Sequence, residues 1–287
     1  MNKKLAIIVP YRDREEHIEK FIPAIENHLD GTGIEYQIWV VEQGNNMLFN
    51  KGLLMNAGYD LTSEAFDYFC FHDVDLLPET TECFYSYPDS VAHLSTFVQQ
   101  YRYKPQYPLT FIGGVALFSK DAFEKTGGYS NGYLHWGAED SDIYWRTQIK
   151  DVSVEQRPGK YLSLVHDKRH GYDKGSPNKS WATHNMARFG QIKRKQEKGE
   201  DVISGDGFRS VEYVVVGKRK WGQHMWVAID FYDGELEEYE YGRGAPSFSF
   251  NMRKDAPPPF AGGTRTTNRT RPQAGSKKFS RNRLKIK

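Results

Sequence analysis

An apolar, aromatic run that leads directly into two aspartates constrains this chain more than any other stretch. The run Phe69-Cys70-Phe71-His72 is followed by Asp73-Val74-Asp75 and then by Leu76-Leu77-Pro78. On an extended backbone Asp73 and Asp75 point to the same side. Carboxylates at the end of a buried strand are costly unless a positive group meets them, and a hard divalent cation carrying a diphosphate is one such group. For an isolated Asp-x-Asp, a common tripeptide, the favoured interpretation is a turn in which the aspartates cap local backbone amides.

Strand-like and helix-like segments alternate over the first 71 residues. The expected strands are Leu5–Val9, Tyr36–Val41 and Phe66–Phe71, and the expected helices are Ile18–Leu29, with a kink at Pro23, and Phe49–Leu61. This order predicts an α/β fold with a mixed, mostly parallel sheet flanked by helices. In such sheets ligands bind at the carboxyl ends of the strands, where Pro10-Tyr11-Arg12 and Asp73-Val74-Asp75 both fall.

The second half of the chain contains further elements and a pair of glycines. Gly113-Gly114, within Phe111–Phe118, suggests a close approach of the backbone to another group. The remaining expected elements are helices over Lys120–Thr126, Ile143–Ile149 and Lys179–Lys198, a strand over Lys160–Val165, and a hairpin of Val211–Val216 with His224–Ile229.

A second charged cluster, Trp136-Gly137-Ala138-Glu139-Asp140-Ser141-Asp142, precedes one of these helices. Acidic residues at a helix N-terminus stabilise the helix dipole, which accounts for Asp142 but not for the preceding Trp136-Gly137. His166 follows an expected strand. A lone histidine there is usually a polar surface residue, but a nearby metal site makes it a candidate ligand.

Charge divides the 287 residues into two parts. Residues 243–287 carry 12 Lys and Arg against one acidic residue, whereas residues 1–242 carry a net charge of −9. We therefore expect one catalytic domain over 1–242 and a disordered basic tail over 243–287. The tail's charge suggests weak contact with polyanions or an anionic membrane surface, and the body has no motif for specific nucleic-acid binding.

The number of cysteines and the N-terminal sequence predict where in the cell the protein resides. Only Cys70 and Cys83 are present, so a disulfide framework is not expected. The short apolar run after Met1 predicts neither a signal peptide nor a transmembrane segment. The expected location is cytoplasmic.

Taken together, these segments resemble the β-1,4-galactosyltransferase family, an inverting, metal-dependent group with a GT-A (Rossmann-like) fold. The resemblance runs from about Leu5 to Ile229, nearly the whole globular body. Any one motif is weak, but the ordered set is specific. The motifs are Ile8-Val9-Pro10-Tyr11-Arg12-Asp13-Arg14-Glu15-Glu16-His17, Phe49–Gly58, Asp73-Val74-Asp75-Leu76, Gly113–Lys120, Trp136–Asp142, His166-Asp167 and Asp206–Tyr213.

The resemblance implies a UDP-sugar donor, a divalent cation such as Mn²⁺, and roles for particular residues. The metal ligands it implies are Asp75 and His166, and the catalytic base is Asp140. Asp73 is expected to support the metal loop or the donor. The donor-binding residues are Pro10, Tyr11, Arg12, Arg14, Phe49, Asn50, Lys51, Asp73, Val74 and Asp75. The sugar-binding residues are Phe111, Gly113, Gly114, Trp136, Gly137, Ala138, Glu139 and Asp140.

These roles predict transfer of galactose from UDP-galactose to a hydroxyl of an acceptor glycan in a β-linkage, β-1,4 by analogy with the family. Metal, carboxylate base and guanidinium groups are also the groups that such a displacement needs. Two alternatives remain open: transfer of N-acetylgalactosamine or another sugar from its UDP derivative, and non-catalytic carbohydrate binding.

The chain departs from the family pattern at three places. Ala138 replaces the second glycine of Trp-Gly-Gly-Glu-Asp, and its added methyl is expected to narrow the acceptor site slightly. Leu164 and Ser163 stand where close relatives carry a third metal ligand. Phe111 falls where family members carry a residue that affects donor choice, and an aromatic ring there suits galactose.

Overall fold

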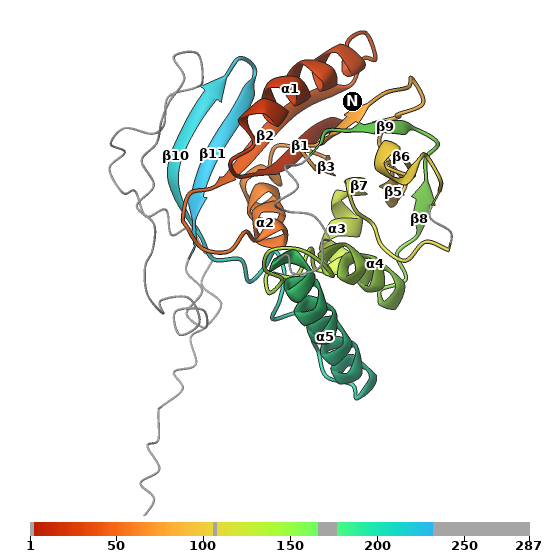
Figure 1. Ribbon diagram of the computed structural model, residues 1–287, viewed down its shortest axis with the longest axis vertical. Helices are drawn as coiled ribbons and strands as arrows, with labels where there is room; N and C mark the ends of the chain where they lie inside the picture. The colour runs from red at the N-terminus through yellow and green to blue at the C-terminus, as the bar shows by residue number, and fades with distance from the viewer. Residues whose placement is uncertain (1–2, 106–107, 166–176, 232–287) are drawn as a thin grey trace, which may run out of the picture.

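The computed structural model describes residues 3–105, 108–165 and 177–231 (Figure 1). His166 and the basic tail lie outside these ranges. The metal role of His166, the disorder of residues 243–287 and the domain boundary after residue 242 therefore stay predictions. Within the described residues, no helix is both long enough and apolar enough to cross a membrane.

An eight-stranded mixed sheet with the strand order β10-β11-β2-β1-β3-β7-β5-β8 forms the centre of the protein (Figure 1). Four of its seven neighbouring pairs are parallel, which confirms the predicted mixed, mostly parallel sheet. Its strands are β1 (Lys4–Tyr11), β2 (Glu35–Gln43), β3 (Tyr68–His72), β5 (Val91–His93), β7 (Val115–Ser119), β8 (Val154–Gln156), β10 (Val214–Trp221) and β11 (His224–Asp230).

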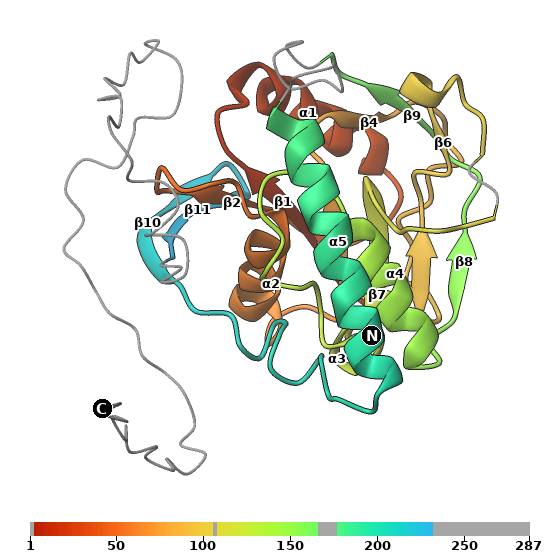
Figure 2. The same ribbon diagram turned by 60° about the horizontal axis from the view of Figure 1, so that its bottom comes forward.

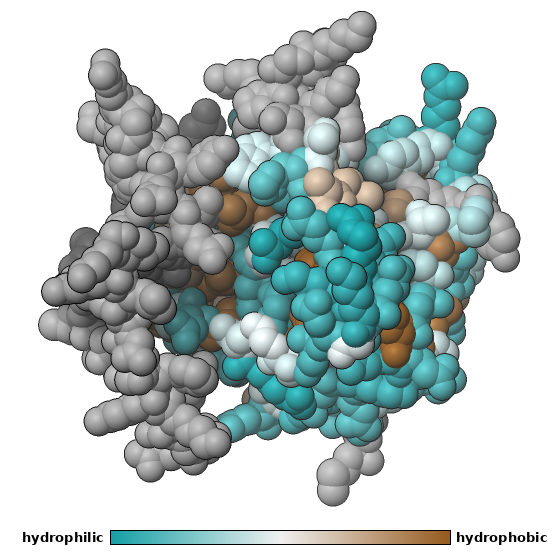
Figure 3. Space-filling view, turned by 90° about the horizontal axis from the view of Figure 1, so that it is seen from below, coloured by the Kyte–Doolittle hydropathy of each residue, from teal (hydrophilic) through white to brown (hydrophobic). Residues whose placement is uncertain are grey.

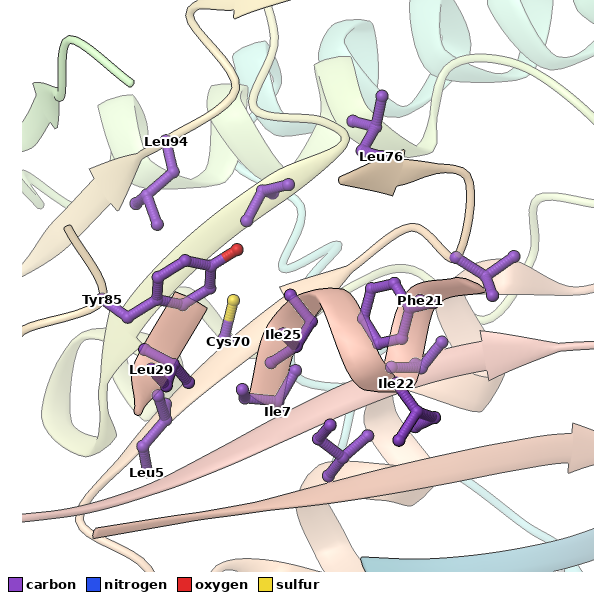
Figure 4. Packing of buried hydrophobic residues seen from close by; sticks show 14 of the residues in the cluster. Leu5, Ile7, Phe21, Ile22, Ile25, Leu29, Cys70, Leu76, Tyr85 and Leu94 are labelled. Atoms are coloured by element: carbon purple, nitrogen blue, oxygen red, sulfur yellow. The ribbon is translucent and has the colours of Figure 1, made fainter. Parts of the chain in front are cut away.

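Helices cover both faces of this sheet because its central strands are apolar on both sides. In β1, Leu5, Ile7 and Val9 pack with helix α1 (Glu15–Leu29), as Figure 4 shows in part. The alternate residues Ala6 and Ile8 pack on the other face. The helices whose buried residues join that second core are α2 (Lys51–Thr62), α3 (Lys120–Thr126) and α4 (Glu139–Ile149).

A separate, smaller sheet of three strands begins just after the C-terminal end of β3. Its order is β4-β9-β6, formed by β4 (Leu76–Pro78), β9 (Lys160–Ser163) and β6 (Phe97–Val98), with a 3-10 turn over Gln99–Tyr101. The pairing of β4 with β9 is continued by a hydrogen bond of 2.7 Å from the backbone N–H of Leu164 to the carbonyl of Asp75. The chain that leads toward residue 166 is therefore fixed beside the Asp-Val-Asp turn.

The last described helix, α5 (Pro177–Glu197), crosses the lower part of the molecule beside α4 (Figures 1 and 2). Its predicted counterpart was Lys179–Lys198. The helix is largely polar, and hydrophilic residues predominate on that face of the molecule (Figure 3). Its buried contacts come from a few residues, of which Asn185 and Phe189 are the most enclosed.

One local prediction was wrong. The hairpin exists, but its first strand is Val214–Trp221 rather than Val211–Val216, and the turn is centred on Gly222-Gln223. Lys218, Arg219 and Lys220 resemble a polar loop in the sequence, yet an edge strand tolerates such side chains because one of its faces is exposed. Pro23 lies inside helix α1, and the kink expected there stays a prediction.

Replacing Gly58 by alanine should destabilise the fold. Gly58 lies in α2, where a Cβ would overlap the Cγ2 of Ile8 and lie 3.1 Å from the Cγ2 of Val41 in the β1–β2 layer. Crowding of this kind costs about 1–3 kcal/mol, more than the gain of about 1 kcal/mol in helix propensity. Urea denaturation measures the difference.

The matched control for this substitution is Gly190→Ala in α5. There the added Cβ meets the tip of the Arg194 side chain at 3.4 Å, so helix propensity should dominate and stability should rise slightly. Equal unfolding free energies for the Gly58 variant and the parent protein would contradict the packing described for α2.

Candidate active site

The Asp-Val-Asp segment forms a turn between β3 and β4 rather than an extended strand. The expectation that Asp73 and Asp75 share one side of an extended backbone was therefore wrong, and the alternative of a turn was correct in shape. The Asp73 carboxylate does not serve to cap the turn, because it contacts Lys51. The Asp73 N–H donates to the carbonyl of Gly114 at 2.8 Å, which fixes the turn to the glycine pair.

The ammonium group of Lys51 lies among three carboxylates. Its Nζ is 3.0 Å from Oδ1 of Asp73, 3.2 Å from Oδ1 of Asp140 and 3.8 Å from Oε1 of Glu139. Lys51 begins α2, Asp73 follows β3, and Glu139 and Asp140 begin α4. Helix α2 is capped by Asn50, whose Oδ1 accepts the N–H of Leu53. The cluster therefore forms at the expected edge of the sheet, where a strand end and two helix starts converge.

Burial and charge shift the pKa values of this cluster. Burial opposes the positive charge on Lys51, but Asp140, Asp73 and Glu139 outweigh it and hold the pKa of Lys51 well above its ordinary value. Burial raises the pKa of Asp140 despite Lys51, and Glu139 and Asp73 raise it further. The pKa of Asp73 is raised by burial as well, with Asp75 adding to the effect. The site thus holds a carboxylate that binds a proton more tightly than an ordinary aspartate.

The predicted donor-binding residues of β1 and of the segment before α2 lie together. The Arg12 guanidinium donates to the carbonyl of Met47 at 2.6 Å and lies over the ring of Phe49, 5.3 Å from its centroid. Tyr11 is buried, and its hydroxyl accepts the N–H of Arg14. Pro10 is the last residue but one of β1, and Val74 is buried inside the turn. This grouping places cationic and aromatic side chains together just before α2, the helix that begins with Lys51.

The glycine pair contacts both the turn and the start of α4. A Cβ at Gly113 would overlap the Asp140 carboxylate, so the absence of a side chain lets the carboxylate rest on the backbone. Gly114 has φ +75°, which favours glycine. Phe111, half-buried, lies two residues before the pair and meets the ring of His93 edge-on at 6.3 Å. The close approach that the sequence suggested is therefore an approach to Asp140.

The predicted acceptor segment leads from an exposed loop into α4. Trp136 has 42% of its surface exposed, and the N–H of Gly137 donates to the Glu139 carboxylate at 3.0 Å. Ala138 has the left-handed φ of +74° and is 7% exposed, in a small cluster with Tyr133 and Phe189 of α5. Because this methyl is buried in that cluster, the expected narrowing of the acceptor site gains no support from its contacts.

Sequence reasoning missed several residues that shape the site. One of them is Arg146, which forms a fully buried ion pair of 2.7 Å with Asp142 and also binds Asp206 at 3.0 Å, so Asp142 has a direct partner besides the helix dipole. Asn131 accepts at its carbonyl from Asn50. The only signals in the sequence were polar residues within apolar or Gly-rich segments. His93 and Ser95, which contact the glycine pair, were also missed, because they too are polar residues within an apolar segment.

Comparisons with known proteins agree with this arrangement. A model of the N-terminal region of glycosyl transferase group 7 matches residues 1–88, and one described as the N-terminal domain of galactosyltransferase matches residues 92–168. The chain belongs to the β-1,4-galactosyltransferase family. It is 30% identical to β-1,4-galactosyltransferase 1 of Bos taurus over 229 residues, which cover 79% of this chain and 54% of that protein.

Another family member, β-1,4-galactosyltransferase 4 of Homo sapiens, is 31% identical over 238 residues, which cover 81% of this chain and 64% of the relative. The chain thus spans between half and two thirds of the length of these two curated relatives. The catalytic domain of Drosophila β1,4-galactosyltransferase 7 in complex with xylobiose matches 82% of this chain and 97% of its own, at 25% identity and a TM-score of 0.64. A mutant of the same enzyme was crystallised with manganese, UDP-Gal and xylobiose. These matches confirm the expected GT-A fold.

The raised pKa of Asp140 predicts how stability depends on pH. The folded protein binds the Asp140 proton more tightly than the unfolded chain, whose aspartate has its ordinary value of 3.8, so ionisation of Asp140 costs stability as pH rises above that value. Without ligands, Asp140→Asn should therefore be more stable than the parent at pH 7.5, by about 1–2 kcal/mol.

Urea denaturation between pH 3.5 and 8 checks this prediction. The advantage of the Asn variant should shrink on acidification and vanish below about pH 4, where the carboxyl is protonated in both states. An advantage that stayed constant over this range would show that charge is not its cause.

Proposed function

We propose that the protein is an inverting galactosyltransferase that moves galactose from UDP-galactose to a hydroxyl of an acceptor sugar, forming a β-linkage, specifically β-1,4. The observation that carries this proposal is the joining of Asp140, Glu139 and Asp73 around Lys51, next to Asp75, at the carboxyl edge of the sheet. Family membership and the manganese and UDP-Gal bound by the mutant of a relative support the choice of donor.

Asp140 is the proposed general base. A carboxylate that binds its proton tightly can accept the proton of an attacking hydroxyl more readily than an ordinary aspartate. Lys51 and the backbone of Gly113 hold this carboxylate in place, and Glu139 stabilises the loop before α4 through the N–H of Gly137. Direct displacement by the acceptor inverts the anomeric centre, so an α-linked donor gives a β-linked product.

The neighbouring residues have proposed binding roles. Arg12 and Arg14 supply guanidinium groups that pair well with phosphate oxygens, and Phe49 supplies a ring face beside Arg12. The remaining donor-side contacts are assigned to Pro10, Tyr11, Asn50, Lys51, Asp73 and Val74. Trp136 offers an exposed apolar face for a sugar ring, and Phe111 and Gly114 are assigned to sugar binding as well.

The residues near Asp75 fit a divalent cation. No cluster of three His, Cys, Asp or Glu side chains suited to a metal occurs among the described residues. Asp75, however, provides a hard oxygen ligand, and its carbonyl holds the backbone at Leu164, two residues before His166. A carboxylate and an imidazole leave positions for diphosphate oxygens, which suits Mn²⁺. When bound, the ion would stabilise the charge that develops on the departing UDP.

A donor and acceptor screen tests the reaction. With Mn²⁺, UDP-galactose should be consumed faster than UDP-N-acetylgalactosamine or UDP-glucose, because the aromatic Phe111 is expected to favour galactose. EDTA should abolish turnover. The acceptor panel includes xylose-terminated sugars, because the Drosophila relative was crystallised with xylobiose. Turnover of UDP-N-acetylgalactosamine alone would overturn the donor assignment, and carbohydrate binding without turnover of any donor would indicate a binding protein.

The base assignment has a separate test. Asp140→Asn should lower kcat on the order of 10²–10⁴-fold, because the amide cannot accept the proton, while UDP affinity measured by calorimetry should change little. Asp121→Asn, an exposed acid in the first turn of α3, is the matched control and should retain full turnover. Turnover of Asp140→Asn at the parent rate would exclude Asp140 as the base.

A further inference from the structure

A buried polar pair, His93 and Ser95, lies directly beneath the glycine pair and has no part in the function described so far. His93 ends β5 and is 2% exposed, and Ser95 is 7% exposed. The neighbouring residues Val91, Ala92 and Leu94 are buried and apolar, so a histidine and a serine stand out at these two positions. Both side chains converge on one backbone atom, the carbonyl oxygen of Gly113.

The hydrogen bonds around this carbonyl define where each proton lies. The Ser95 hydroxyl is 2.6 Å from the Gly113 oxygen and His93 Nε2 is 2.9 Å from it. Because a carbonyl only accepts, both groups donate, so His93 carries a proton on Nε2. Burial lowers the pKa of His93 to about 4, so the ring is neutral at pH 7. Ser95 Oγ accepts the N–H of Val115 at 3.0 Å and lies 3.1 Å from His93 Nε2. The carbonyl of Gly113 thus accepts from both side chains and also from the backbone N–H of Val115, at 2.9 Å.

Gly113 transmits this constraint to Asp140. The Asp140 carboxylate rests on the Cα of Gly113, where any side chain would displace it. The backbone is tied as well, since the N–H of Ile112 donates to the Asp140 carbonyl at 3.0 Å. A rotation of the Gly113 peptide would therefore move the surface that supports the carboxylate. Gly114 carries the same constraint to the Asp73 N–H.

The polar pair lowers the stability of the fold relative to apolar side chains at the same positions. Among the described residues, His93 Nδ1 is buried and has no hydrogen-bond partner. An unsatisfied buried polar atom costs about 1–3 kcal/mol. An apolar side chain of similar volume would avoid this cost, so packing alone does not account for a histidine at this position.

We propose that His93 is a positioning residue for the Asp140 carboxylate, acting with Ser95 through the Gly113 carbonyl. This inference rests on the proposed role of Asp140 as the base. It predicts that the loss of His93 affects the chemical step more than the binding of UDP, because the contacts of the pair lead to Gly113, Phe111 and Asp140 and not to Arg12 or Phe49.

The experiment compares His93→Leu, which removes the donor, with His93→Gln, whose amide N–H can take the place of Nε2–H. In His93→Leu, kcat should fall about tenfold or more, since small displacements of a catalytic group have large effects on rate. The affinity for UDP, measured by calorimetry, should stay within about twofold of the parent value. His93→Gln should recover most of kcat. An unchanged kcat in His93→Leu would overturn the proposal.

His224→Leu is the matched control. His224 is also 2% exposed, but its ring nitrogens bind the Ile38 N–H and Glu26, away from the site. A loss of kcat in His224→Leu equal to that in His93→Leu would show a general effect of destabilisation and overturn the proposal. If His93→Leu does not fold, Ser95→Ala decides, because it removes one donor to the same carbonyl. A kcat lowered about threefold would support the proposal, and an unchanged kcat would overturn it.

Asp140→Asn in the same assay separates this proposal from the function on which it rests. An inactive Asp140→Asn together with a fully active His93→Leu overturns only the positioning role. A fully active Asp140→Asn overturns the base assignment and, with it, the role of His93.

Discussion

The attraction between the Lys51 ammonium and three neighbouring carboxylates is the constraint on which the rest of the site depends. Three carboxylates brought together at the end of a sheet would repel one another and would each lose hydration. One buried cation from a different helix makes the arrangement possible. Because α2, α4 and the turn after β3 all contribute to it, the packing of these elements against the sheet sets the geometry of the cluster.

The glycine pair Gly113-Gly114 supports the same ion cluster through the backbone. Gly113 has no side chain where Asp140 lies, and the Gly114 carbonyl accepts the N–H of Asp73. The two aspartates that bind Lys51 therefore also share one backbone support. A site built in this way is held by hydrogen bonds to the main chain and by one ion cluster, and its precision depends on how well the peptide of Gly113 is fixed.

Much of the fold could be predicted from sequence because its signals are local. The apolar runs of β1, β2 and β3 and the helical spacing in α1 identify a sheet with helices on both faces, and the strand ends then locate the site. The hairpin bounds were missed because Lys218, Arg219 and Lys220 look like a loop although they lie on an edge strand. The turn at Asp73 was misjudged because its shape depends on contacts with Gly114 and Leu164, which are distant in sequence. The same limit applies to His93, because its proposed role depends on a hydrogen bond to the carbonyl of a residue twenty positions away.

The antiparallel pairing of β3 with β7 has a consequence for how this chain can be divided. The two family models meet between residues 88 and 92, as if the chain consisted of two modules. In space, however, β3 comes from the first segment and β7 and β5 come from the second, and they are neighbours in one sheet. Lys51 belongs to one segment and Asp140 to the other. The boundary between the two family models is thus not a boundary between structural domains. Each half, separated from the other, would expose an open sheet edge and would lack some of the charged residues of the site.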